Sequence, residues 1–407
     1  MPVAKLGKMY YLSGAPRVST AELSTTPGPR SHILGITGSA AKMGIGVSSR
    51  IAGDTAIARK HLQGEGSDSV GSGWRGVVRD SIRVVWRWGF ALWAYRCVPT
   101  TPFFVYERYG LMQSGAMLLR RRATCVIVEC NGIFFKEADG DRSNLTFKRL
   151  ARYWEIRSYV KSDLVIAVSE QLRGELISLH PRLERTAICV PNGVDTDHFS
   201  PRSLVRADSE SWVIGWIGTI LRWQGVFELI ESVARVSRDS GLRICIKIIG
   251  DGPDRDRCVE VAERLLPGRV EFVGRVATEN VPSLFDNVDF AYAGHLPLTD
   301  APMYHSPLKL FEYMSMGIPT VASDSRDARS TLSVLGLDSM IFDSSSPESL
   351  DKALLAGVSF GRDSKIRSRM RRAIVDHHSW TNRLELILAK ATSLIDGENV
   401  DKGNTDD

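Results

Sequence analysis

The 407-residue sequence contains no run that approaches the roughly 18 consecutive apolar residues of a membrane-spanning helix, and its first residues lack the apolar core of a secretory signal. The six cysteines form no Cys-x-x-Cys pair, and most of them lie in apolar strand-like or helical runs. This usage is typical of buried, reduced thiols in a reducing compartment. We therefore expect a cytoplasmic chain, either free or peripheral on the inner face of a membrane.

Several catalytic patterns are also absent. There is no P-loop, no zinc-ligand spacing and no Ser-His-Asp arrangement. The Asp-Gly-Asp at 139–141 is predicted to be a turn rather than a metal site, because it does not follow a strand beside a nucleotide site. The net charge of +5 permits an anionic ligand but is too small to indicate nucleic acid.

What is present is a regular alternation of strand-like and helix-like segments that begins near residue 8 and restarts after a polar linker at 201–210. Hydrophobic residues make up 43% of the chain, which is enough for two cores. Such alternation predicts an α/β protein with two doubly wound, Rossmann-like parallel sheets, over residues 1–200 and 211–378. Ligands of such sheets bind beyond the carboxyl ends of the strands, so the cleft between two facing domains is the expected site.

The segment "HSPLKLFEYMSMGIPTVASD", residues 305–324, predicts a helix followed by a buried strand. Ser306 is suited to the N-cap, Pro307 to the first helical position and Gly317 to the residue after the helix. Lys309 and Glu312 are neighbours on the helix surface. Taken alone, the pattern fits an ordinary helix with an exposed ion pair. After a strand end, however, the helix N-terminus is an anion site suited to phosphate, and the Glu312 carboxylate could accept hydrogen bonds from ribose hydroxyls.

Six stretches, in this order, resemble glycosyltransferase family 4, the retaining, nucleotide-sugar-dependent enzymes of GT-B fold. The resemblance runs from about residue 8 to 395, and "SGAPRVST" and "YERYG" are similar to a bacterial branch that builds surface polysaccharides such as exopolysaccharide or lipopolysaccharide. It implies transfer of a sugar from a nucleotide-diphosphate donor to a saccharide or lipid-linked acceptor, without a metal. The six stretches are "VIAVSEQLRGEL", "VPNGVDTDHFSP", "IGWIGTILRWQGVFELIE", "IIGDGPDR", "VEFVGRV" and "SPLKLFEYMSMGIPTVASD".

The resemblance also implies roles for single residues. Glu312 would bind the ribose, Lys309 would lie near the phosphates, and the segment 272–276 would hold the base through its backbone. The remaining donor-binding positions that it implies are Gly14, Gly218, Gly274, Arg275, Ser306, Pro307 and Leu308.

Three positions depart from the wider family: Tyr304 replaces a glutamate, Thr219 an arginine and Gln224 a lysine. The two missing basic residues normally neutralise the leaving diphosphate, so Arg222 or Lys309 would have to substitute. These departures motivate an alternative, a non-catalytic GT-B paralogue that binds nucleotide-sugar or acts as a scaffold in a polysaccharide assembly complex. A sugar epimerase of the same double-domain fold is a weaker alternative, since those chains lack this combination of motifs.

The segment 74–96 carries arginines at 75, 79, 83 and 87 along one third of a helix. Apolar residues, among them Val85 and Leu92, lie on the opposite side. One interpretation is a basic, aromatic helix on an anionic membrane surface. The other is an ordinary helix whose apolar face packs on its sheet, and the two interpretations are compatible.

Polar residues near the strand ends of the first domain are candidates for orienting the acceptor. Glu129 and Asn131 are the candidates assigned to catalysis, and Glu107 and Arg108 share the same rim. For each of them a structural ion pair or cap is an alternative, and His32 either faces the site or caps its helix. Beyond the second domain we expect a helix at 379–395 that crosses back to the first domain, followed by a disordered tail at 396–407.

Overall fold

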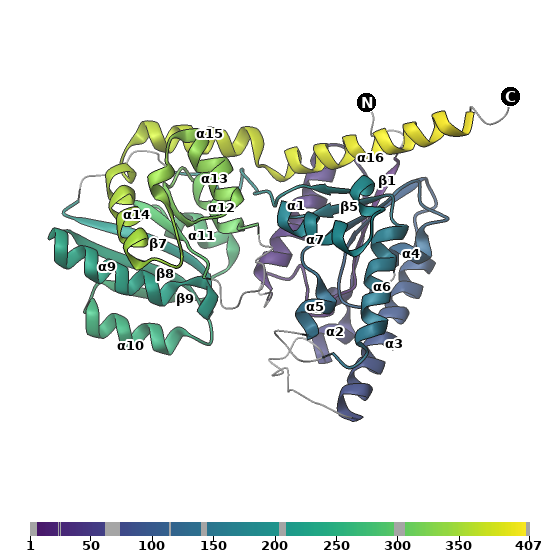
Figure 1. Cartoon of the computed structure of the whole chain (residues 1–407), viewed down its shortest axis with the longest axis horizontal. Helices are drawn as coiled ribbons and strands as arrows, with labels where there is room; N and C mark the ends of the chain where they lie inside the picture. The colour runs from purple at the N-terminus through teal and green to yellow at the C-terminus, as the bar shows by residue number, and fades with distance from the viewer. Residues whose placement is uncertain are drawn as a thin grey trace. The chain divides into compact units, whose positions relative to one another are not determined.

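The computed structural model describes residues 6–22, 24, 26–61, 74–113, 115–139, 145–202, 209–296 and 306–403. Tyr304 and the last two residues of the Asp-Gly-Asp segment lie outside these ranges. The chain divides into two units, which we call unit 1 and unit 2 (Figure 1). Unit 1 comprises Met1–Asn192, Tyr304–Ser306 and Trp380–Asp407, and unit 2 comprises Gly193–Met303 and Pro307–Ser379.

Unit 1 contains a six-stranded, entirely parallel sheet in the order β2-β1-β3-β4-β5-β6. Its central strands are buried along nearly their whole length because helices cover a parallel sheet on both faces. The elements are β1 (Lys8–Ser13), α1 (Pro27–Lys42), β2 (Val47–Ile51), η2 (Ala52–Asp54), α2 (Ala56–His61), α3 (Trp74–Arg96), β3 (Phe103–Arg108), α4 (Gly115–Leu119), β4 (Val126–Cys130), α5 (Phe134–Asp139), α6 (Lys148–Lys161), β5 (Leu164–Ala167), α7 (Glu170–Leu179), α8 (Leu183–Thr186), β6 (Ala187–Cys189) and α16 (Trp380–Gly403).

Unit 2 contains a second parallel sheet, in the order β12-β11-β10-β7-β8-β9. Helix α9 contacts both α10 and α14 on one side of this sheet (Figure 1). The elements are β7 (Ser211–Thr219), η3 (Arg222–Gln224), α9 (Val226–Ser240), β8 (Arg243–Asp251), α10 (Arg255–Leu265), β9 (Val270–Gly274), η4 (Thr278–Asn280), α11 (Val281–Leu284), β10 (Phe290–Ala293), α12 (Leu308–Ser315), β11 (Thr320–Ser323), α13 (Arg326–Leu332), η5 (Ser333–Leu335), η6 (Asp338–Met340), β12 (Ile341–Phe342), α14 (Pro347–Phe360) and α15 (Ser364–His377).

One predicted boundary differs from the structure: helix α16 runs to Gly403 instead of ending at 395. A short strand, β6, precedes the turn residues "VPNG" and pairs with β5.

Buried carboxylates in unit 1 stabilise the starts of three helices. Each accepts hydrogen bonds from backbone N–H groups at a helix N-terminus, where the first four such groups have no partner within the helix. Glu107 therefore fills the alternative role of a cap. The bonds run from Ala116 to Glu107 for α4, from Phe134 and Phe135 to Glu155 for α5, and from Thr146 and Phe147 to Asp80 for α6.

Helix α3 buries Phe90, Ala91 and Ala94, so the packed-helix interpretation of segment 74–96 describes its last turns. Along the rest of the helix most large apolar residues stay outside: Val85 is 71% exposed. Polar side chains face inward there, since Asp80 caps α6 and the Arg87 guanidinium donates to the carbonyl of Leu111 over 3.1 Å. Within the described residues, no helix is long and apolar enough to cross a membrane.

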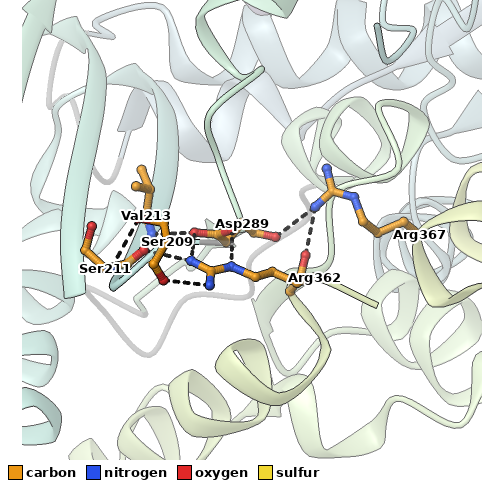
Figure 2. A network of polar contacts seen from close by, with 7 residues as sticks. Ser209, Ser211, Val213, Asp289, Arg362 and Arg367 are labelled. Carbon is orange, nitrogen blue, oxygen red and sulfur yellow. Dashed lines mark hydrogen bonds and ion pairs between the residues drawn. The ribbon is translucent and has the colours of Figure 1, made fainter. Parts of the chain in front are cut away.

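Asp289, which is fully buried, lies at the amino-terminal edge of the sheet in unit 2 (Figure 2). The Asp289 carboxylate accepts from the backbone N–H of Val213 over 2.8 Å and from the Arg362 guanidinium over 3.0 Å. Arg362 also donates to the carbonyls of Ser209 and Ser211, and Arg367 donates to the carbonyl of Asp289. One charge pair therefore links β7, β10 and the turn between α14 and α15.

We expect Asp289→Ala to lower the free energy of unfolding by about 3 kcal/mol, because Arg362 is left largely buried without its counter-charge. Urea unfolding followed by tryptophan fluorescence measures this change. Asp239→Ala is the matched control, since the Arg238–Asp239 pair of the same unit is exposed. Equal midpoints for the two variants would contradict a stabilising role for the buried pair.

Candidate nucleotide-sugar site

The strand order of unit 2 reverses between β7 and β10, and the loops after these two strands form the base of the candidate site. The Trp223 ring stacks on the His295 ring with 5.5 Å between centroids. The backbone N–H of Leu296 donates to the Trp223 carbonyl over 2.8 Å. Ligands of open parallel sheets bind outside the carboxyl ends of the strands at such a reversal.

Helix α12 begins at Leu308 and has Pro307 as its N-cap, so the prediction of Ser306 as N-cap is wrong. The Ser306 hydroxyl accepts instead from the backbone N–H of Asn192 over 3.1 Å, and the Ser306 carbonyl accepts from the Asn192 amide. Pro307 itself offers no side-chain hydrogen bond to the start of α12, and none from another side chain is seen among the described residues. Its first N–H groups therefore keep their capacity to bind an anion. At the other end, Gly317 follows the helix with φ 67°, as predicted.

Lys309 is half-buried and turned toward the strand end of β7. Its ammonium donates to the Gln224 amide oxygen and lies 4.3 Å from the centroid of the Trp216 ring. Burial lowers the pKa of Lys309 to about 7, against the opposing effect of Glu312. The predicted alternative of an ordinary exposed ion pair therefore does not describe this lysine.

Gly218 makes room for that lysine. A Cβ at Gly218 would lie 3.0 Å from the Lys309 nitrogen, and its φ of 148° is one that side-chain-bearing residues rarely adopt. Strand β7 thus needs glycine at residue 218, because a side chain there would crowd Lys309, the predicted phosphate-binding residue.

Glu312 lies one turn further along α12 and is half-buried. Burial raises the pKa of its carboxyl to about 7, against the opposing effect of the Lys309 charge. Within the part of the chain that the structure describes, no side chain donates a hydrogen bond to this carboxylate. It is available to accept bonds from hydroxyl groups of a ligand.

Arg222 is already engaged by neighbouring groups. Its guanidinium pairs with the carboxylate of Glu228 and lies 6.0 Å from the centroid of the Phe227 ring. Thr219 ends β7 opposite Asp251 and adds no positive charge. Lys309 is therefore the basic side chain that the structure brings to the start of α12.

The predicted base-binding segment lies at the end of β9. Gly274 has φ 81°, and a Cβ there would meet open space. The Arg275 guanidinium lies 3.7 Å from the Asp251 carboxylate and is 60% exposed. The backbone of Gly274 is accessible, which is what backbone recognition of a base requires.

In unit 1, Glu129 is the centre of a buried polar cluster. Its carboxylate accepts from the Tyr106 hydroxyl over 2.6 Å and from the Asn131 amide, and it lies 2.9 Å from His32 Nε2. Burial alone would raise the pKa of Glu129, but His32, Arg108 and Tyr106 together lower it to about 2. A carboxylate of such low basicity is suited to orienting its neighbours and not to accepting a proton.

Gly14 lies against Gln113, a residue that the sequence did not single out. The Gly14 N–H donates to the Gln113 amide oxygen over 3.1 Å, and a Cβ at Gly14 would lie 2.9 Å from the Gln113 amide carbon. The Gln113 amide nitrogen donates in turn to Glu107. The close approach that requires glycine here is thus made by a protein side chain. Gln113 was missed because it lies in no motif, and Trp216 was missed as a single residue although it lies in the quoted stretch "IGWIGTILRWQGVFELIE".

Among the residues that the structure describes, no group of three or more His, Cys, Asp or Glu side chains is arranged to hold a metal ion. The expectation that the reaction needs no metal stays a prediction.

Comparison with known proteins supports the resemblance to glycosyltransferases that the sequence motifs indicate. The family model for glycosyl transferases group 1 matches residues 211–358, and that for glycosyltransferase family 4 matches residues 84–198. A protein described as a colanic acid biosynthesis glycosyltransferase, WcaL of Escherichia coli, is 27% identical over 164 residues, and WcaL of Salmonella typhimurium has the same identity. The matched segment spans 40% of this chain and 40% of each of these relatives.

Solved structures share the fold at low sequence identity. Sucrose-phosphate synthase from Thermosynechococcus elongatus has a TM-score of 0.66 at 14% identity, over 96% of this chain and 100% of that one. HepE from Anabaena, solved with UDP, has a TM-score of 0.60 at 15% identity, over 95% of this chain and 100% of that one. These likenesses and the two doubly wound sheets identify the GT-B fold. The two family models identify a glycosyltransferase family 4 domain over residues 84–198 and a glycosyl transferases group 1 domain over residues 211–358, so the chain is a glycosyltransferase.

Proposed function

We propose that the protein is a retaining glycosyltransferase that moves a sugar from a nucleotide-diphosphate sugar to a saccharide or lipid-linked acceptor in cell-surface polysaccharide biosynthesis. The family supports sugar transfer, and the partial match to WcaL supports a role in polysaccharide synthesis. The single observation that carries the proposal is Lys309, held at the start of an uncapped helix at the strand-order reversal, with Glu312 one turn away.

The donor is proposed to be a UDP-sugar. HepE has been solved with UDP and with UDP-glucose, and TarM of Staphylococcus aureus with UDP. In this chain the uncapped N-terminus of α12 and Lys309 would hold the diphosphate, Glu312 the ribose and the backbone at Gly274 the base.

The proposed mechanism is a front-face substitution. The bond between the anomeric carbon and the diphosphate oxygen breaks, and its electron pair leaves with the diphosphate. The acceptor hydroxyl attacks the same face of the sugar, and a phosphate oxygen takes its proton. The dipole of α12 and the Lys309 ammonium stabilise the charge on the leaving group. Arg222 contributes only if its pairing with Glu228 breaks, so Lys309 carries this role in the proposal.

The non-catalytic alternative rests on Thr219, Gln224 and Tyr304. The structure gives Gln224 a defined task, since its amide oxygen receives the Lys309 ammonium and holds it at the strand end. Transfer from the donor, or its slow hydrolysis, by purified protein separates an enzyme from a scaffold. Proton NMR of the product then determines whether the anomeric configuration is retained.

Thermal unfolding with UDP tests the donor site. At a hundred times its dissociation constant, UDP should stabilise the fold by roughly 2.7 kcal/mol, which is about 5 to 10 °C for a unit of this size. Glu312→Ala should remove most of this shift, because it removes the acceptor for ribose hydroxyls. Glu263→Ala, an exposed carboxylate on α10, is the matched control. A shift in Glu312→Ala that equals the wild-type shift would refute the ribose role.

The pH dependence of UDP binding tests Lys309. With a pKa of about 7, its ammonium is the main form below that pH, so UDP affinity should not change there through this group. Above pH 7 the fraction of Lys309 in the ammonium form falls with each pH unit, and the affinity for UDP should fall by up to about tenfold per unit. Titration calorimetry at successive pH values measures this. Lys309→Met should flatten the profile, and Lys365→Met, an exposed lysine of α15, should not.

The turnover number kcat tests whether Lys309 stabilises the transition state. We expect Lys309→Ala to reduce kcat by roughly 10² to 10³, the effect of removing one preorganised charge from a leaving group. An unchanged kcat would remove Lys309 from the mechanism. Arg222→Ala is the informative comparison, because its guanidinium is bound to Glu228 and we expect a much smaller loss.

A further inference from the structure

Helix α3 of unit 1 presents an apolar strip to solvent. Trp74, Ile82 and Val85 are 72%, 62% and 71% exposed. A soluble domain normally turns such a strip toward its core and exposes the polar side. Other large apolar residues of the same helix are also exposed, namely Val77, Val78, Leu92, Trp93 and Tyr95.

Buried polar contacts, together with the buried apolar residues Phe90, Ala91 and Ala94, fix the orientation of α3. Asp80 receives the backbone N–H groups at the start of α6 and the Arg83 guanidinium, and it is completely buried. Arg87 is also buried and donates to the Leu111 carbonyl. If α3 rotated to bury its apolar strip, Asp80 would move away from the start of α6. The helix would lose its cap, and these contacts would break. The outward apolar strip is therefore a stable feature of unit 1.

The neighbouring helix α6 supplies positive charge. Trp88 of α3 and Trp154 of α6 meet edge to face with 5.8 Å between ring centroids, so the two helices lie side by side (Figure 1). We call the exposed sides of both helices the α3–α6 face. Five cations of α6 are exposed on it: Lys148, Arg149, Arg152, Arg157 and Lys161.

The same face contains no exposed acidic side chain. Asp80 and Glu155 are the acidic residues of α3 and α6, and both are completely buried as helix caps. At the far end of α3, Arg96 is exposed, and Arg122 lies 4.6 Å from the centroid of the Tyr95 ring. An apolar strip beside these cations matches the interface of an anionic bilayer, where apolar side chains enter the acyl boundary and cations meet phosphate head groups.

We propose that the α3–α6 face docks the protein on an anionic lipid bilayer. A second copy of the chain is a poor occupant, because pairing two such faces would bring their cations together. The proposal is independent of the donor site, since all of its residues lie in unit 1 and its test measures lipid binding. It would hold the acceptor-side unit at the surface where lipid-linked acceptors are found.

Co-sedimentation with vesicles tests the proposal. Wild-type protein should bind vesicles of phosphatidylcholine and phosphatidylglycerol and should bind vesicles of phosphatidylcholine alone much more weakly. The variant Ile82→Gln with Val85→Gln should bind the anionic vesicles about tenfold more weakly, since two exposed apolar side chains are lost from the inserted strip. Arg149→Gln with Arg152→Gln should reduce binding by about fivefold for each charge removed, and added salt should reduce the difference.

Matched controls distinguish this face from general surface effects. Val334→Gln in unit 2 and Leu386→Gln on α16 remove apolar side chains that are 80% and 55% exposed elsewhere. Arg238→Gln removes an exposed cation of unit 2. Each control should bind anionic vesicles as the wild type does, and all variants should keep the wild-type midpoint in urea because every altered side chain is exposed.

Three outcomes would overturn the proposal. The first is no binding of the wild type to anionic vesicles. The second is equal weakening by the α3 variant and the Val334→Gln control. The third is a dimer, measured by sedimentation equilibrium, that the α3 variant dissociates without any change in vesicle binding, which would assign this face to a second copy.

Discussion

The reversal of strand order between β7 and β10 is the constraint on which the site of unit 2 depends. Parallel strands on either side of a reversal send their following loops in opposite directions, and ligands of such sheets bind at their carboxyl ends. Lys309 reaches the strand end of β7 from α12 and is held there by Gln224, Trp216 and the space left by Gly218. Its lowered pKa follows from that burial.

Three buried carboxylates of unit 1 have structural roles at the starts of helices. Asp80, Glu107 and Glu155 each accept N–H groups at the start of a helix, which offsets the cost of burying them. Glu129 is different, because it gathers His32, Tyr106 and Asn131 around one anionic group near the strand ends. A buried cluster of this kind fixes the orientation of its polar side chains more readily than it exchanges protons.

Helix α3 connects these internal demands with the proposed docking surface. The need to cap α6 keeps Asp80 inside, where the Arg83 guanidinium pairs with it, and the apolar strip of α3 is left outside as a consequence. The same helix pattern in isolation is equally compatible with an ordinary packed helix. Two features of the folded unit favour the docking surface: the buried position of Asp80 and the exposed cations of α6 beside it.

The sequence by itself determined the α/β class, the two parallel sheets, the helix after residue 307 and its end at Gly317, because periodicity and turn residues act locally. It also indicated Lys309 and Glu312 as a pair, since their spacing is a property of one helix. Only the tertiary structure decided that Ser306 binds Asn192 instead of capping α12, that Arg222 is taken by Glu228, and that Gln224 holds Lys309. These outcomes depend on contacts between residues far apart in the chain, and on which buried polar group finds which partner, and no local pattern encodes them.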